Sequence, residues 1–282
     1  MSSPVRPLSG IMSYSCCRPS SVTRLSNLFG QSLKAKSRGI VVKVFLGTIF
    51  LLLAGCANVA PMAVDKQTKS LDVNSKSIVL MTVDLSRPEP SRYIPHPLLI
   101  DFTKKGSQDK PERLVFQVDK DAGTASSETH NKFLLRVALE PGEYELKTIF
   151  GNANAFPFNG FFQVPLLENI NISPNTVTYV GRVNALMRPR VGEEFRAGSV
   201  IPLIDQAATG VSGSTFDVTI VDLSDEEVPE FKAVFPILAN VAIQKSILPP
   251  FDRAKAQTWW ETDGNVKTPR KETADTSHSA AN

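Results

Sequence analysis

Histidine and cysteine are scarce in this chain, which has three of each among 282 residues. All three cysteines lie within the first 56 residues, so a domain formed by the rest of the chain has no disulfide, no cysteine-based zinc site and no thiol nucleophile. His96, His130 and His278 show no pair with the spacing of metal ligands, such as two positions four apart on a helix. The sequence therefore predicts no metal site, no cofactor and no catalytic residues.

Acidic residues are absent from the first 55 positions, which carry seven basic ones. The net charge of +3 is therefore misleading, because the remaining residues hold 24 basic and 28 acidic side chains, a net of −4. A mildly acidic domain lacks the basic surface that neutralises phosphates, so we expect no nucleic acid among its partners.

The chain also lacks an apolar run of the roughly 20 residues that a membrane-spanning helix needs. The uncharged stretch 44–53 is shorter, follows basic residues and leads into small residues, which is the layout of a secretory signal. The segment Leu53-Ala54-Gly55-Cys56 resembles the lipobox of bacterial lipoproteins. A buried strand or an uncleaved anchor is the other interpretation of the run.

The lipobox resemblance implies that Cys56 is acylated, that the chain is cut before it, and that the protein is held in a bacterial cell envelope. Two or more acyl chains make such anchoring stable. The resemblance also implies a destination, because Ala57 rather than Asp follows the cysteine. By the sorting rule of these lipoproteins, the outer membrane is favoured over the inner membrane.

The ends of the chain differ in composition from its centre. Residues 1–41 are rich in Ser and Arg without periodicity, and we expect them to be dispensable. Translation from the codon of Val42 would give a compact signal peptide, and a genuinely long N-terminal region is the alternative. The predicted organisation is a dispensable segment (1–41), a signal peptide (42–55), the lipidated cysteine with a flexible tether (56–76), a folded domain (77–262) and a disordered tail (263–282).

The folded domain shows the period-two alternation of half-buried strands, interrupted by Pro, Gly and Asn turns. Many short strands with frequent turns predict a mainly β protein, an antiparallel β-sandwich or barrel. The predicted strands are 78–85, 98–103, 113–118, 132–139, 143–150, 160–164, 176–187, 199–204 and 215–222.

Two turns in this region predict hairpins. Pro141-Gly142 has the order of a type II turn, which requires a positive φ at the glycine and directs Tyr144 and Leu146 to the core. The segment resembles the P-G-x-Y-x-L hairpin of transthyretin-like and carboxypeptidase-regulatory-like β-sandwiches. Residues 119–123 suggest the opening of a calcium loop, but His130 stands where the bidentate Glu is needed, so a hairpin turn is favoured.

The helical signal is confined to the C-terminal third, which predicts a small helical element beside the sandwich. Residues 224–227 form a capping box with three acidic residues at the positive end of a helix. A single apolar face follows, and Pro236 should end the helix. Residues 250–260 favour one more helical turn.

Aromatic residues gather at two places that suggest ligand or partner contacts. Segment 152–162 combines four Phe with three Asn, whose rings and amides suit a glycan or an envelope protein. Because its Phe residues have both parities, we expect Phe161 or Phe162 to be buried and Phe156 or Phe158 to be over one-third exposed. The candidate contact residues are Phe156, Phe158, Asn154, Asn159, Trp259 and Trp260.

These features favour a lipid-anchored envelope protein with a non-catalytic binding or structural module. The alternative is a carbohydrate-active envelope hydrolase with two facing carboxylates about 5–10 Å apart.

Overall fold

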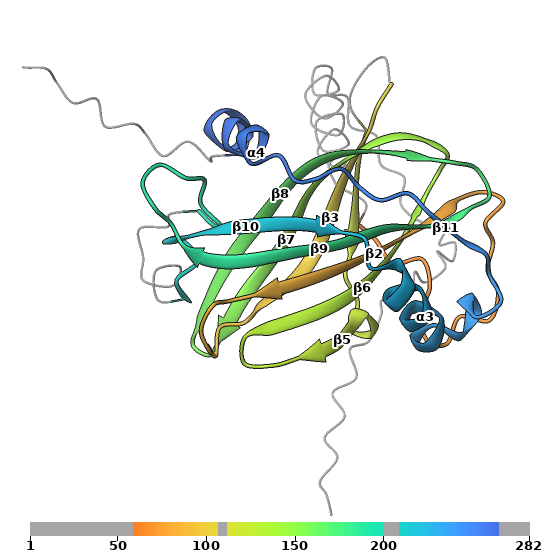
Figure 1. Cartoon of the computed structure of the whole chain (residues 1–282), viewed down its shortest axis with the longest axis horizontal. Helices are drawn as coiled ribbons and strands as arrows, with labels where there is room; N and C mark the ends of the chain where they lie inside the picture. The colour runs from red at the N-terminus through yellow and green to blue at the C-terminus, as the bar shows by residue number, and fades with distance from the viewer. Residues whose placement is uncertain (1–58, 107–111, 200–208, 265–282) are drawn as a thin grey trace, which may run out of the picture. The chain divides into compact units, whose positions relative to one another are not determined.

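A computed structural model describes residues 59–106, 112–199 and 209–264 (Figure 1). The chain divides into a unit ending at Cys56 and a unit beginning at Ala57, and the described residues belong to the second. This unit is a mainly β protein in which two sheets pack face to face, with a small C-terminal helical element, as the sequence predicts.

Sheet A has five strands in the order β1-β4-β3-β7-β8. Its pairs are antiparallel except β1 with β4, which are parallel. The strands are β1 (Val59–Ala60), β3 (Pro95–Lys104), β4 (Glu112–Gln117), β7 (Gly142–Ala155) and β8 (Phe158–Ile172).

Sheet B has the strand order β10-β9-β2-β6-β5, and β11 also pairs with β9. The β2–β9 and β11–β9 pairs are parallel. The sandwich is therefore mixed, whereas the sequence predicts an antiparallel one. The strands are β2 (Ser77–Ser86), β5 (Gly123–Ser126), β6 (His130–Leu139), β9 (Val177–Pro189), β10 (Ser214–Val221) and β11 (Ile243–Lys245). The predicted strand at 199–204 falls, apart from its first residue, outside the described residues.

The core lies between the sheets and is built from alternate residues of each strand. Ile100 and Phe102 of β3 and Val83 and Leu85 of β2 belong to one cluster of buried apolar side chains. A second apolar cluster lies on the outer side of sheet B, where α3 (Ser224–Val234) covers Leu80 and Tyr179. The outer side of sheet B is therefore covered by a helix that has its own apolar cluster.

The Pro141-Gly142 turn connects the two sheets, because β6 belongs to sheet B and β7 to sheet A. The predicted hairpin is wrong, although Gly142 has the predicted positive φ, at +144°, and Tyr144 and Leu146 are buried. The Tyr144 hydroxyl donates to the Glu140 carbonyl at 3.0 Å, as in the tyrosine corners of other β-sandwiches. This bond holds the chain where it changes sheets.

The segment 119–123 is also a crossing between sheets and not the hairpin turn that was predicted. A 3-10 turn, Lys120–Ala122, separates β4 of sheet A from β5 of sheet B. Asp119 is held there by Arg136, whose Nη2 donates to Asp119 Oδ2 at 2.6 Å.

Residues 59–65 pack on the domain, which differs from the flexible tether predicted over 56–76. β1 adds to the edge of sheet A, and Met62 and Val64 are buried. The fully buried Arg136 guanidinium donates twice to the Val64 carbonyl, at 2.9 and 2.7 Å. The sequence pattern does not show this docking, because its partners in β4 and β6 lie more than 50 residues away.

Two helices follow β10. The first, α3, begins at Ser224, so its N-cap is Leu223 and the predicted capping box with Ser224 as the N-cap does not form. Instead, Asp222 Oδ1 accepts a hydrogen bond from the Ser224 amide. The second, α4 (Arg253–Trp259), is the predicted helical turn and continues into a π-helical turn, Trp260–Gly264. Among the described residues, no helix is long and apolar enough to cross a membrane.

Candidate functional site

A cleft of about 420 Å³ lies on the outer side of sheet A, and we call it the Trp259 cleft. Strands β3, β4, β7 and β8 form its floor, and α4 supplies one wall through Trp259. The floor residues alternate with core residues, so that Asp101, for example, lies between Ile100 and Phe102. The lining residues are Leu99, Asp101, Arg113, Val115, Lys147, Thr148, Phe150, Gln163 and Trp259.

The Trp259 cleft combines an apolar floor with an uneven set of charges. Asp101 is only 8% exposed, and its Oδ2 accepts from Arg113 Nε at 2.9 Å. Burial raises the pKa of the Asp101 carboxyl, against the opposing effect of Arg113 and Lys147. With two cationic side chains and one carboxylate, the lining favours a ligand that carries negative charge.

Two buried polar atoms of cleft residues have no hydrogen-bond partner. They are Asp101 Oδ1, an acceptor, and Trp259 Nε1, a donor. A buried polar group left unpaired costs about 1–3 kcal/mol, which pairing with a ligand can recover. A hydroxyl group can pair with either kind of atom, because it donates to a carboxylate oxygen and accepts from an indole N–H.

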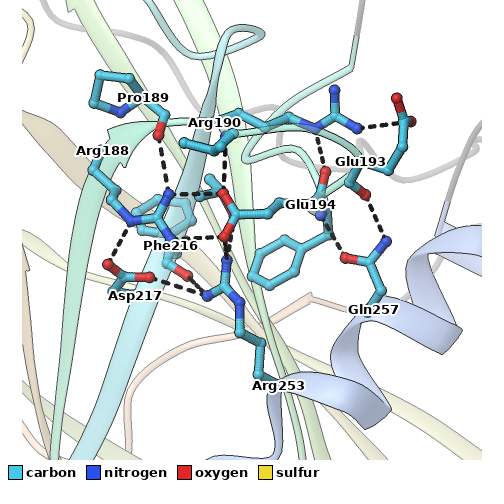
Figure 2. A network of polar contacts seen from close by, with 12 residues as sticks. Arg188, Pro189, Arg190, Glu193, Glu194, Phe216, Asp217, Arg253 and Gln257 are labelled. Atoms are coloured by element: carbon cyan, nitrogen blue, oxygen red, sulfur yellow. Dashed lines mark hydrogen bonds and ion pairs between the residues drawn. The ribbon is translucent and has the colours of Figure 1, made fainter.

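A network of charged residues fixes α4, and therefore Trp259, against the sandwich (Figure 2). Glu194 accepts two hydrogen bonds from Arg188 of β9, both 2.7 Å, and one from Arg253 of α4, also 2.7 Å. Asp217 of β10 accepts from the same two arginines, at 2.6 and 3.1 Å. The hydrogen bond from Arg188 lowers the pKa of Glu194 to about 2.

Further contacts hold α4 on both sides of this network. Gln257 accepts from the Phe195 amide at 2.6 Å and donates to the Glu193 carbonyl at 2.8 Å. Asp252 caps the helix by accepting from the Lys255 amide at 3.0 Å, and Lys255 Nζ donates to the Leu167 carbonyl of β8. The helix position is thus set by contacts with β8, β9, β10 and the segment that follows β9.

A second cleft, of about 550 Å³, lies where the ends of β3 and β4 meet β5 and β6. His96 contacts Asn131 there, stands edge-on to Phe133, and has its pKa lowered by burial. Thr124 Oγ1 and Asp119 Oδ1 are buried without a partner, but the other Asp119 oxygen already binds Arg136. The Trp259 cleft, with an indole wall and two cations, is the more complete site for a ligand.

The structure separates the residues that the sequence singled out. Asn154 and Asn159 face each other across the β7–β8 hairpin, whose tip is Phe156-Pro157. Phe156 is 97% exposed, whereas Phe158 packs partly against the core, which confirms the predicted exposure of one of them.

The remaining aromatic predictions divide in the same way. Phe162 is buried, as expected, while Phe161 is 41% exposed and stacks on Phe150 with ring centres 5.8 Å apart. Trp260 packs partly against the core, under Arg190. Of the six predicted contact residues, Trp259 is the one found in the lining of the cleft described above.

Sequence reasoning missed the polar side chains of the Trp259 cleft. Asp101, Arg113, Lys147 and Gln163 occupy the outer-facing positions of four strands and look like an ordinary solvated face. Only the pairing of those strands brings them together. Comparison of the chain with family models, curated proteins and solved structures gives no match.

Proposed function

We propose that this protein is a lipid-anchored protein of the bacterial cell envelope, whose sandwich is a non-catalytic binding module. The Trp259 cleft is its ligand site, and the ligand carries hydroxyl groups and a negative charge, as an acidic glycan does. The observation that carries the ligand class is the pair of unpartnered atoms, Asp101 Oδ1 and Trp259 Nε1, beside Arg113 and Lys147.

The cleft chemistry matches each part of such a ligand. The Trp259 indole and the Phe150 ring offer apolar surface, to which the less polar face of a sugar ring binds. Arg113, whose side chain is 65% exposed, can reach a ligand while one of its nitrogens stays on Asp101. Among the described lining residues, Asp101 is the one carboxylate. A glycoside hydrolase, which needs two facing carboxylates, is the alternative hypothesis.

Ligand binding can be followed by the fluorescence of Trp259. The full-length Trp260→Phe protein, purified from membranes in detergent, has Trp259 as its sole tryptophan. We expect trigalacturonate, an acidic trisaccharide, to change its emission and to bind at least about tenfold more tightly than uncharged maltotriose, which corresponds to about 1.4 kcal/mol.

A matched variant locates the binding. Calorimetric titration of Trp259→Ala in the otherwise native protein should show loss of trigalacturonate binding, whereas Trp260→Phe should retain it. Equal binding of trigalacturonate and maltotriose, or undiminished binding by Trp259→Ala, would overturn the proposed ligand class or its site.

The anchor is tested separately at Cys56. Labelled palmitate should enter the native protein, and Cys56→Ser should abolish the label and leave unprocessed precursor. Ala54→Ser is a suitable control and should still be labelled, because it keeps a small residue near the cysteine. Label that still enters Cys56→Ser would contradict the lipoprotein hypothesis.

A further inference from the structure

Strand β1 lies beside the Trp259 cleft. Val59 pairs with Val115 of β4, Val115 pairs with Asp101 of β3, and Asp101 pairs with Thr148 of β7. The last three residues line the cleft. Because paired residues point to the same side of a sheet, the Val59 side chain extends the row of cleft residues on the outer side of sheet A.

The proposed anchor is close to this row along the chain. Two residues, Ala57 and Asn58, separate Cys56 from Val59. A three-residue step spans at most about 10 Å even when it is fully extended. Since residues 59–65 are docked on the sandwich, they add no further length, and a lipid on Cys56 would keep this face near the bilayer.

The same face carries exposed apolar and basic side chains. Val59 is 47% exposed and Phe161 is 41% exposed, and the 97% exposed Phe156 stands at the tip of the β7–β8 hairpin. Val191, at 72%, is the other large apolar side chain exposed in the described residues, and it lies after β9. Apolar and aromatic groups with nearby cations are typical of surfaces that rest on anionic membranes.

Charged side chains on the outer side of sheet A lie close to its apolar residues. The basic Arg113 and Lys147 lie next to the row that contains Val59, and the acidic Glu145 lies at the level of Arg113, because both residues pair with Thr103 of β3. Helix α3 covers the opposite side. The outer side of sheet A therefore combines exposed apolar side chains with charges of both signs, close to the proposed anchor.

We infer that the outer side of sheet A rests on the membrane surface and that the ligand of the Trp259 cleft is a lipid headgroup that bears hydroxyls and a phosphate. This inference rests on the proposed function for both the anchor and the ligand chemistry. It adds the orientation of the domain and the source of the ligand. Phosphatidylglycerol has the required headgroup, with two hydroxyls and one negative charge.

Orientation can be measured with one label on each side of the sandwich. Gln117 is exposed on the outer side of sheet A, beside Val115, and Ala233 is exposed on α3. Gln117→Cys and Ala233→Cys each carry a thiol-reactive fluorophore, since the Cys56 thiol of the mature protein is acylated. Each full-length lipidated variant is reconstituted in phosphatidylcholine–phosphatidylglycerol vesicles that contain a nitroxide-headgroup lipid.

We expect the nitroxide to quench at least about half of the emission at position 117 and little at position 233, because interfacial contacts lie within about 5–10 Å of the headgroups. Insertion of a Gly-Ser segment of about 20 residues between Ala57 and Asn58 should reduce the difference, since such a segment spans roughly 25 Å. Equal quenching at both positions in the native-length protein would overturn the orientation.

The headgroup is tested by the Trp260→Phe protein in vesicles with and without phosphatidylglycerol. A change in Trp259 emission that needs phosphatidylglycerol and disappears in Asp101→Asn supports the lipid ligand. An emission that is the same in phosphatidylcholine alone overturns it. If trigalacturonate still binds in that case, the proposed function stands and only the lipid source fails. Loss of both responses means that the proposed function itself is wrong.

Discussion

Each outer side of the sandwich holds a buried carboxylate, and the two are satisfied very differently. On sheet B, Glu227 of α3 is fully buried and accepts from the Tyr179 hydroxyl at 2.6 Å and from Arg182 at 2.5 Å, with Lys132 Nζ 3.6 Å away. On sheet A, Asp101 has one oxygen on Arg113 and the other without a partner.

This difference separates a carboxylate with both oxygens paired from one with a buried oxygen that has no partner. Both oxygens of Glu227 are used to fix α3 on sheet B, which closes that side of the protein. Asp101 lines the Trp259 cleft, and its Oδ1 has no hydrogen-bond partner within the protein. Burial alone therefore does not indicate a functional residue, and it is the unpaired oxygen of Asp101, in a cleft, that makes this residue a candidate in our proposal.

The largest expected effect comes from breaking the closed side. Glu227→Ala leaves the buried Tyr179 hydroxyl and the Arg182 and Lys132 charges without their partner, which should lower the free energy of unfolding by about 3–5 kcal/mol. Chemical denaturation of the purified protein measures this loss. The exposed neighbour Glu226 is the control, and Glu226→Ala should change stability by less than about 0.5 kcal/mol. A similar small change for both variants would contradict the assigned role of Glu227.

A smaller effect is expected where α4 is held beside the open side. Glu194 has its pKa lowered to about 2, so its ionised form stabilises the folded protein above the ordinary carboxyl pKa of about 4.5. That contribution is lost as the pH falls from about 4.5 to 2, because the folded state then takes up a proton that the unfolded state already holds.

Glu194→Gln removes this pH dependence. At pH 7 the variant should be less stable by about 1 kcal/mol, because it loses charge-assisted bonds to Arg188 and Arg253 that are partly exposed to solvent. Melting curves between pH 7 and pH 2 should converge for the native protein and the variant. Curves that stay parallel down to pH 2 would show that the Glu194 network does not stabilise the fold.

The open side should respond in binding more than in stability. Asp101→Asn replaces a half-paired carboxylate with a neutral amide, so stability should change by no more than about 1 kcal/mol. Binding of trigalacturonate should weaken by about tenfold, or about 1.4 kcal/mol, because a hydroxyl of the sugar loses the charged carboxylate as its acceptor. A large loss of stability with unchanged binding would place Asp101 in the same class as Glu227.

The smallest effect is expected at the hairpin tip. Phe156→Ala should change stability by less than about 1 kcal/mol, because the ring is 97% exposed. Phe162→Ala, which removes a fully buried ring from the same hairpin, should cost about 3–5 kcal/mol. Thermal unfolding distinguishes the two, and a large loss for Phe156→Ala would mean that the tip is packed.

The sequence by itself determined most of the longer strands, where the chain turns, and that one ring of each Phe pair is buried or exposed. Alternation in segments such as 78–85 and 132–139 is a local property of each strand, so β2 and β6 follow from it. The helix at 224–234 and its end before Pro236 depend on local backbone chemistry in the same way. Opposite parity in Phe161 and Phe162 was enough to predict that one ring is buried.

Only the tertiary structure decided which strands pair, and therefore what the outer side of each sheet carries. The Pro141-Gly142 turn has hairpin chemistry but connects two sheets, because β6 pairs with β2 and β5 in sheet B whereas β7 pairs with β3 and β8 in sheet A. Asp101, Arg113 and Trp259 form one cleft through strand pairing and through the Glu194 network that positions α4. Long-range contacts of this kind leave no local pattern, whereas backbone preferences and side-chain alternation do.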